Sequence, residues 1–247
     1  MGLNQHFILF NQLPLIYGRV PKVANTSIKA SLSRLLKTPP EQGVRSTTDV
    51  FWIKSTHGET SLITPLEARS HRGTHFSFSF VRNPFDRLVS AYNNKVLELD
   101  DVTRPMQEMG LRHNMPFAEF LEQTVSTDDE KLDVHLLPQA RILCVDGQLI
   151  PSFVGQMEQM RSHWQTLQNW LRRERLPELG EIPEKNVRRG DDHSDLKQYY
   201  ADPATVRMVE ERYGEDIALF YNGFSSEQLI SGDALPFTEP KSPLLPI

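Results

Sequence analysis

The sequence has little cysteine: Cys144 is the single residue of that type among 247. One thiol excludes a disulfide within the chain, and it leaves no group of cysteines to hold a structural zinc ion. Because proteins without disulfides suit reducing compartments, we expect a cytoplasmic location.

Long apolar segments are missing as well, and the longest run near the N-terminus is Phe7 to Phe10. A helix that spans a membrane needs roughly 20 apolar residues. A secretory signal would need a basic region followed by a longer apolar stretch than this one. The sequence therefore predicts a soluble protein without a membrane span.

An excess of positive charge is also absent, since 27 Lys and Arg residues face 32 Asp and Glu residues, a formal net charge of −5. General nucleic-acid binders carry a basic excess, so we expect no nucleic-acid partner. A local basic pocket for one small anion is compatible with this charge.

Two segments of the chain follow the order strand, short turn, helix. Residues 13–20 have the apolar character of a buried strand, and Ile28, Leu32, Leu35 and Leu36 then recur at helical spacing. Residues 75–81 alternate phenylalanine with serine, and Pro84 suits the first turn of a helix that follows. Two such units joined by a crossover predict an α/β fold with a central parallel sheet flanked by helices.

The remaining pattern predicts further elements and the domain boundary. We expect helices at 116–125, 158–175 and 203–213, the last closed by Gly214, and a hairpin at 141–151 that turns at Asp146-Gly147. Residues 1–224 form one domain in this interpretation, and the proline-containing residues 225–247 form a tail. The oligomeric state stays open.

The first candidate site is the turn Pro21 to Ser27, between the first predicted strand and helix. Backbone N–H groups at a helix N-terminus attract anions, and Lys22 adds a full positive charge. A nucleotide-binding Walker loop would need G-x-x-x-x-G-K-[ST], and neither glycine is present. A P-loop kinase is therefore disfavoured, while a capped helix start with an exposed lysine remains the simpler alternative.

The second candidate site follows the second strand. Arg82 stands at its carboxyl end, where ligands of open α/β sheets collect, and Ser90 comes two helical turns later. A guanidinium and a hydroxyl are suitable partners for a phosphate monoester. We interpret Asp86 and Arg87 as an ion pair at the surface or the helix start.

Both segments resemble one known family. Residues 20–29 are similar to the 5'-phosphosulfate-binding loop of the membrane-type carbohydrate ("family 2") sulfotransferases, and residues 80–92 are similar to the 3'-phosphate-binding motif of that family. The resemblance implies a P-loop-like three-layer fold. It also implies 3'-phosphoadenosine-5'-phosphosulfate (PAPS) as co-substrate, adenosine 3',5'-bisphosphate (PAP) as product, and no metal.

The resemblance also implies roles for individual residues. Lys22 would neutralise the leaving phosphate, and Arg82 and Ser90 would bind the 3'-phosphate. Arg188, or its neighbour Arg189, would reach the adenosine or its 3'-phosphate. The other residues of the donor-binding loop are Val23, Ala24, Asn25, Thr26 and Ser27. His135 and Gln139 lie in a segment similar to the family's His-x-x-Pro-Gln, where acceptor binding and helix packing are equally open.

The general base has three candidates. His57 lies between the two cofactor motifs, and histidine titrates near neutrality, as general-base work requires. Glu59 is two residues away and could face the same side of a strand, and His135 is the third candidate. The expected reaction is in-line transfer of a sulfuryl group from PAPS to a hydroxyl of a carbohydrate or small alcohol. The alternatives are a P-loop-type nucleotide kinase and a non-catalytic member of the fold that binds PAP or a glycan.

Overall fold

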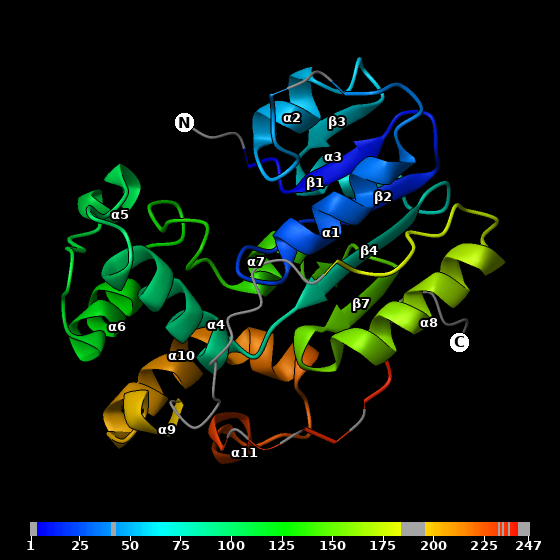
Figure 1. The fold of residues 1–247 in the computed structure, drawn as a ribbon. Coiled ribbons are helices and arrows are strands. Elements are labelled where there is room, and N and C mark those ends of the chain that lie inside the picture. The colour runs from blue at the N-terminus through cyan, green and yellow to red at the C-terminus, as the bar shows by residue number, and fades with distance from the viewer. Residues whose placement is uncertain are drawn as a thin grey trace. The chain divides into compact units, whose positions relative to one another are not determined.

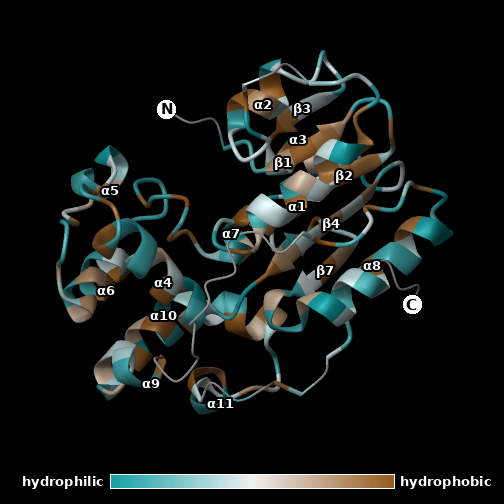
Figure 2. Cartoon of the chain, viewed as in Figure 1, coloured by the Kyte–Doolittle hydropathy of each residue, from teal (hydrophilic) through white to brown (hydrophobic). Residues whose placement is uncertain are grey.

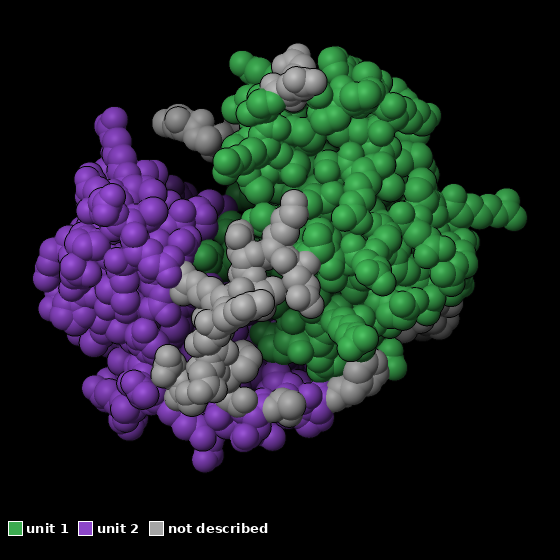
Figure 3. All heavy atoms as spheres, viewed as in Figure 1, with its two compact units in different colours: residues 1–81, 141–188, 238–247 green, residues 82–140, 189–237 purple. Residues whose placement is uncertain are grey.

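The computed structural model describes residues 4–40, 43–183, 196–231, 233, 235–236 and 238–241. The chain divides into two compact units (Figure 3). Unit 1 comprises residues 1–81, 141–188 and 238–247, and unit 2 comprises residues 82–140 and 189–237. The boundary expected at residue 224 stays a prediction.

Unit 1 is built on a five-stranded sheet (Figure 1). Its strands are β1 (Phe7–Phe10), β2 (Leu15–Gly18), β3 (Thr60–Ile63), β4 (Phe76–Val81) and β7 (Phe153–Gln156), in the order β3-β1-β2-β4-β7. β2, β4 and β7 are parallel, which confirms the predicted parallel core. β1 is antiparallel to both of its neighbours, which the sequence did not predict. The four residues between β1 and β2 are too few for a crossover, so the two strands form a hairpin.

The alternation of β4 sends its side chains to two different layers. Phe76 and Phe80 pack against Trp170 and Trp164 of α8 (Met160–Arg173). The serines face the other layer, where the Ser79 hydroxyl donates to the Gly18 carbonyl at 2.8 Å. Small side chains there let α7 (Gln139–Leu143) approach closely, since a Cβ on Gly18 would lie 2.9 Å from Leu143. Figure 1 shows α1 and α8 in front of the sheet and α7 behind it, so unit 1 has the expected three layers.

The other helices of unit 1 are short. They are α1 (Asn25–Leu32), η1 (Ser33–Leu35), α2 (Asp49–Lys54), α3 (Pro65–Ser70) and η3 (Met157–Gln159). The helix expected through Leu36 thus tightens into a 3₁₀ turn after Leu32. α8 begins at Met160 and ends at Arg173, inside the predicted range 158–175, and its visible side is mostly polar in Figure 2.

The predicted hairpin is present but shorter than expected. β5 (Cys144–Val145) and β6 (Gln148–Leu149) pair antiparallel, and residues 141–143 belong to helix α7 instead. Asp146 and Gly147 have φ of 51° and 71°. Two consecutive positive φ angles are the mark of a type I′ turn, which confirms the predicted turn.

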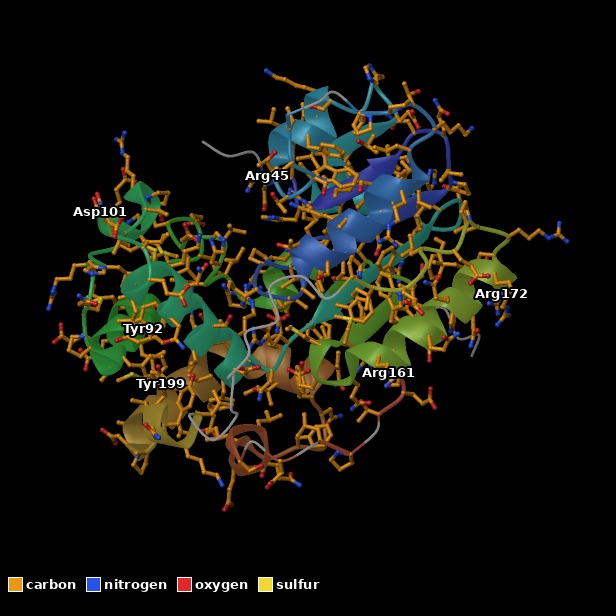
Figure 4. All side chains as sticks on the ribbon, in the orientation of Figure 1. Arg45, Tyr92, Asp101, Arg161, Arg172 and Tyr199 are labelled. Atoms are coloured by element: carbon orange, nitrogen blue, oxygen red, sulfur yellow. The ribbon has the colours of Figure 1, made fainter. Side chains whose placement is uncertain are left out.

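Unit 2 is helical. Its elements are α4 (Pro84–Tyr92), the π-helical turn η2 (Asn93–Leu97), α5 (Arg104–Glu108), α6 (Phe117–Ser126), α9 (Leu196–Tyr199), α10 (Pro203–Phe220) and α11 (Ser226–Ile230). Aromatic rings hold several of them together: Tyr92 of α4 and Tyr199 of α9, both labelled in Figure 4, have ring centroids 6.0 Å apart. The predicted stop at Gly214 is wrong. α10 only kinks, at Tyr213, and continues to Phe220, because both aromatic side chains are buried on the same helix.

Within the described part of the chain, no helix is long and apolar enough to cross a membrane.

Candidate active site

The turn after β2 has an unusual backbone. Lys22 and Ala24 have positive φ angles of 67° and 45°, a region that residues other than glycine seldom adopt. Ala24 caps α1, and its carbonyl accepts from the N–H groups of Ser27 and Ile28, both at 3.0 Å. Val23 is buried beneath the turn, while Lys22 and Thr26 are half-buried. The turn expected between strand and helix is therefore present, at the carboxyl edge of β2, and its binding of an anion stays a prediction.

Asn25 holds this turn in place. Its Oδ1 accepts from the Tyr17 hydroxyl at 2.6 Å, and its Nδ2 donates to the Val20 carbonyl at 2.7 Å. Tyr17 is buried in the sheet, which raises the pKa of its hydroxyl and keeps that group a donor. The Asn25 side chain is therefore engaged in shaping the loop, a role that the sequence alone did not reveal.

A charged cluster borders the same turn. Lys29 of α1 is buried, and its Nζ donates to the Thr47 carbonyl at 3.1 Å and lies 3.7 Å from a carboxylate oxygen of Asp49. Arg19, directly after β2, bonds the same carboxylate. Burial and the nearby Arg19 charge lower the pKa of Lys29 to about 8. Two cations and one carboxylate leave this edge of the sheet positive, which suits an anionic ligand.

Arg82 is the first residue of unit 2 and is nearly buried. Its Nε and Nη2 donate to the two carboxylate oxygens of Asp86, at 2.6 and 2.8 Å. The predicted ion pair of Asp86 with Arg87 is therefore wrong, because the four-residue spacing on the first turn of α4 favours Arg82. Ser90 lies two turns farther along α4 and is half-buried.

The sequence placed Arg87 in an ion pair at the surface or the helix start, but the residue is buried, with 1% of its surface exposed. Its guanidinium donates to the carbonyls of Leu137 (2.9 Å) and Val134 (3.4 Å). Burial lowers its pKa, although the charge of Asp216 opposes this shift. Arg87 thus stabilises the segment that carries His135.

Gln139 has no exposed surface. Its side-chain amide pairs with the backbone of Arg82, as acceptor from the N–H at 2.9 Å and as donor to the carbonyl at 2.8 Å. The buried carboxylate of Asp216 accepts from the Gln139 N–H at 2.8 Å and from the Ala140 N–H at 2.7 Å. Of the two roles left open for Gln139, this arrangement corresponds to packing.

His135 forms a pair with Asp133. The imidazole Nδ1 lies 2.7 Å from Oδ1 of Asp133, which also accepts from the His135 backbone N–H at 2.9 Å. Burial alone would raise the pKa of Asp133, but these bonds lower it, so the group is a carboxylate at neutral pH. The pair fixes the ring and directs Nε2 away from Asp133, while the side chain of His135 keeps 29% exposure.

His57 and Glu59 lie elsewhere in unit 1. They precede β3, whose first residue Thr60 pairs with Phe10, at the amino edge of the parallel strands. Lys22 follows the opposite, carboxyl edge, and a four-residue strand is roughly 10 Å long. The structure therefore does not bring these two residues to the Lys22 turn.

The side chain of Glu59 accepts hydrogen bonds from the backbone. Its carboxylate is buried and accepts from the N–H groups of Lys37 (2.9 Å) and Thr38 (2.7 Å). These bonds lower the pKa of Glu59 despite its burial. The exposed ring of His57 lies 3.2 Å from the Pro39 carbonyl. Arg188 and Arg189, the remaining predicted site residues, fall outside the described residues.

Comparison with known proteins identifies the family. Residues 5–222 match the sulfotransferase family. The chain belongs to this family. The match confirms the resemblance carried by residues 20–29 and 80–92, and it favours a sulfotransferase over a P-loop kinase.

Curated relatives in the family support the same assignment. The chain is 28% identical to human carbohydrate sulfotransferase 14 over 186 residues, which cover 69% of this chain and 47% of that protein. It is 26% identical to zebrafish (Danio rerio) carbohydrate sulfotransferase 14 over 239 residues, covering 88% and 62%. The chain therefore spans about half to three fifths of the length of these relatives. No solved structure matches it.

Among the described residues of this sulfotransferase-family chain, no group of three or more His, Cys, Asp or Glu side chains is arranged to hold a metal ion.

Proposed function

We propose that this protein transfers the sulfuryl group of PAPS to a hydroxyl of a carbohydrate acceptor. One observation carries the proposal: the two segments that resemble phosphate-binding motifs follow β2 and β4, which are adjacent and parallel with Gly18 paired to Ser79. Both motifs thus begin at one edge of one sheet, as a nucleotide with phosphates at both ends of its ribose requires. Membership of the sulfotransferase family supports the donor, and the names of the relatives support the acceptor class.

Lys22 and the turn around it act on the leaving group. The acceptor oxygen attacks sulfur, and the bond between sulfur and the 5'-phosphate oxygen breaks, so negative charge builds on that phosphate. The Lys22 ammonium and the N–H groups at the start of α1 stabilise this charge. The left-handed conformation of Lys22 and Ala24 shapes the turn that would surround the phosphate, and the hydrogen bonds of Asn25 hold the turn in this shape.

Arg82 and Ser90 bind the 3'-phosphate. The Asp86 carboxylate already fixes the plane of the Arg82 guanidinium, so little conformational entropy is lost on binding. Arg82 and Ser90 would recognise the 3'-phosphate, as Lys22 would recognise the 5'-end of the donor.

We assign the general base to His135, the third of the sequence's candidates. Asp133 holds its Nδ1, the arrangement that leaves Nε2 available to take the acceptor proton as the new S–O bond forms. The products are a sulfate ester, PAP and the proton on His135, which passes to water. The position of His57 and Glu59 at the amino edge of the strands disfavours both.

Transfer of ³⁵S from labelled PAPS to a panel of glycans tests the function. We expect labelled glycan without added metal, and thermal stabilisation by PAP but not by ATP with Mg²⁺. PAP binding without transfer to any glycan, phenol or small alcohol would indicate the non-catalytic alternative. Stabilisation by ATP with Mg²⁺ alone would indicate a kinase.

A further inference from the structure

Gln139 controls the backbone of Arg82. Its amide satisfies both polar groups of that residue, the N–H at 2.9 Å and the carbonyl at 2.8 Å. A pair of bonds to one residue fixes its φ and ψ angles, much as a strand partner does. The chain enters unit 2 at Arg82 and leaves it after Ala140, so the bonds join the two ends of one segment of this unit.

Asp216 decides which way the Gln139 amide points. Burial raises the pKa of Asp216, while the bonds from Ala140 and Gln139 and the charge of Arg87 lower it. Its Oδ2 accepts from the backbone N–H of Gln139 at 2.8 Å and from Nε2 of the same residue at 3.3 Å, so the amide group that faces it is a donor. Nε2 must therefore be the atom between Asp216 and the Arg82 carbonyl, which leaves Oε1 for the Arg82 N–H. Asp216 is itself held by the Ala140 N–H at 2.7 Å and has no exposed surface.

Two independent devices thus act on Arg82: Asp86 orients the guanidinium, and Gln139 with Asp216 fixes the main chain. We propose that Gln139 and Asp216 are positioning residues, which aim Arg82 at the 3'-phosphate of the donor. The proposal rests on the proposed function, in which Arg82 binds that phosphate. Neither residue touches the nucleotide or the acceptor, because both are fully buried.

Calorimetric titration with PAP and with adenosine 5'-monophosphate, which lacks the 3'-phosphate, tests this role. The preference for PAP is the ratio of the two dissociation constants. Gln139→Leu should lower this preference about tenfold, the effect of losing roughly one hydrogen bond to a charged group, with the monophosphate affinity unchanged. In an Arg82→Ala background the same substitution should lower it no further, since the residue it positions is gone.

Gln139→Glu gives a second variant with nearly unchanged shape. When protonated, its side chain can still donate to the Arg82 carbonyl. When ionised, it repels both that carbonyl and Asp216, which also raise its pKa. The charge of the buried Arg87, which acts on Asp216, opposes this rise. The variant's preference for PAP, divided by that of the wild type at the same pH, should fall as pH rises and the introduced carboxyl ionises. A role in stability alone would lower the melting temperature and leave this ratio flat.

The outcomes separate the two proposals. A wild-type protein without preference for PAP, or an Arg82→Ala variant that keeps it, would refute the role of Arg82 and thus the proposed function. A wild-type preference that depends on Arg82 but survives in both folded Gln139 variants would overturn the positioning role alone. If Gln139→Leu does not fold, the pH dependence of Gln139→Glu decides the question.

Discussion

The guanidinium of Arg82 and the carboxylate of Asp86 face each other in a fork, with Nε 2.6 Å from Oδ2 and Nη2 2.8 Å from Oδ1. The two residues are one helical turn apart, and both side chains are largely shielded from water. An arginine held in this way keeps its charge and loses its freedom to rotate. A phosphate that arrives at α4 therefore meets a cation that is already oriented.

Arg82 and Lys22 should contribute to different steps. Arg82→Ala should weaken PAP binding by about 1.5–3 kcal/mol, because it removes hydrogen bonds to a charged group. Lys22→Met should lower kcat much more than PAP affinity, because the charge that Lys22 faces grows only in the transition state. Calorimetry and single-turnover kinetics measure the two quantities. If both variants lost the same amount of PAP affinity and Lys22→Met showed no additional loss of rate, the two residues would not have these different roles.

Tyr17→Phe should loosen the Lys22 turn. It removes the donor to Asn25 Oδ1 and should lower the free energy of unfolding by about 1 kcal/mol and raise the KM for PAPS. Tyr92→Phe is a matched control, since its hydroxyl donates to the Met115 carbonyl at 2.7 Å in unit 2. Its stability loss should be similar and its KM for PAPS unchanged. An unchanged KM in both variants would show that the turn does not need the Tyr17 bond.

Glu59 should act on stability and not on catalysis. Its pKa is lower in the folded chain than the ordinary value of 4.5, so its contribution is fully present above that value and is lost as pH falls through the folded pKa. Glu59→Gln should therefore lower the free energy of unfolding by about 1–3 kcal/mol at neutral pH. Denaturant titrations near pH 7 and near pH 3 should show that the difference from wild type shrinks in acid.

Glu67 provides the control for this measurement. Its carboxylate also accepts from a backbone N–H, that of Thr64 in the capping box of α3, but the side chain is exposed to water. Glu67→Gln should have a smaller effect at neutral pH. A large loss of single-turnover rate in Glu59→Gln would instead restore Glu59 as the base.

His135→Ala should lower the single-turnover rate by roughly 10²–10⁴ with little change in PAP affinity. Asp133→Asn should lower the rate by a smaller factor, since an amide oxygen can still accept from Nδ1. His57→Ala is the comparison variant. Loss of rate in His57→Ala and normal rates in His135→Ala would transfer the assignment to His57.

The sequence determined much of the fold around the proposed donor site. The alternation of phenylalanine and serine in residues 76–81 identified β4, and Pro84 marked the start of α4. The turn after β2 was also evident, because Lys22 and its neighbours form a continuous motif. These features are local: strand period, helix start and loop chemistry are set by residues close together in the chain.

Tertiary structure decided the features that depend on partners far along the chain. Pairing of Thr60 with Phe10 sent Glu59 to the amino edge of the strands, an outcome of strand order that no local pattern contains. Arg87 can be buried because its guanidinium donates to the carbonyl of Leu137, which is 50 residues away in the sequence. Asp216 lies 77 residues from Gln139 in the sequence and orients its amide toward Arg82, which is 57 residues from Gln139. A buried charge or amide is stable only where such distant groups replace water, so its place in the protein is known only after the chain has folded.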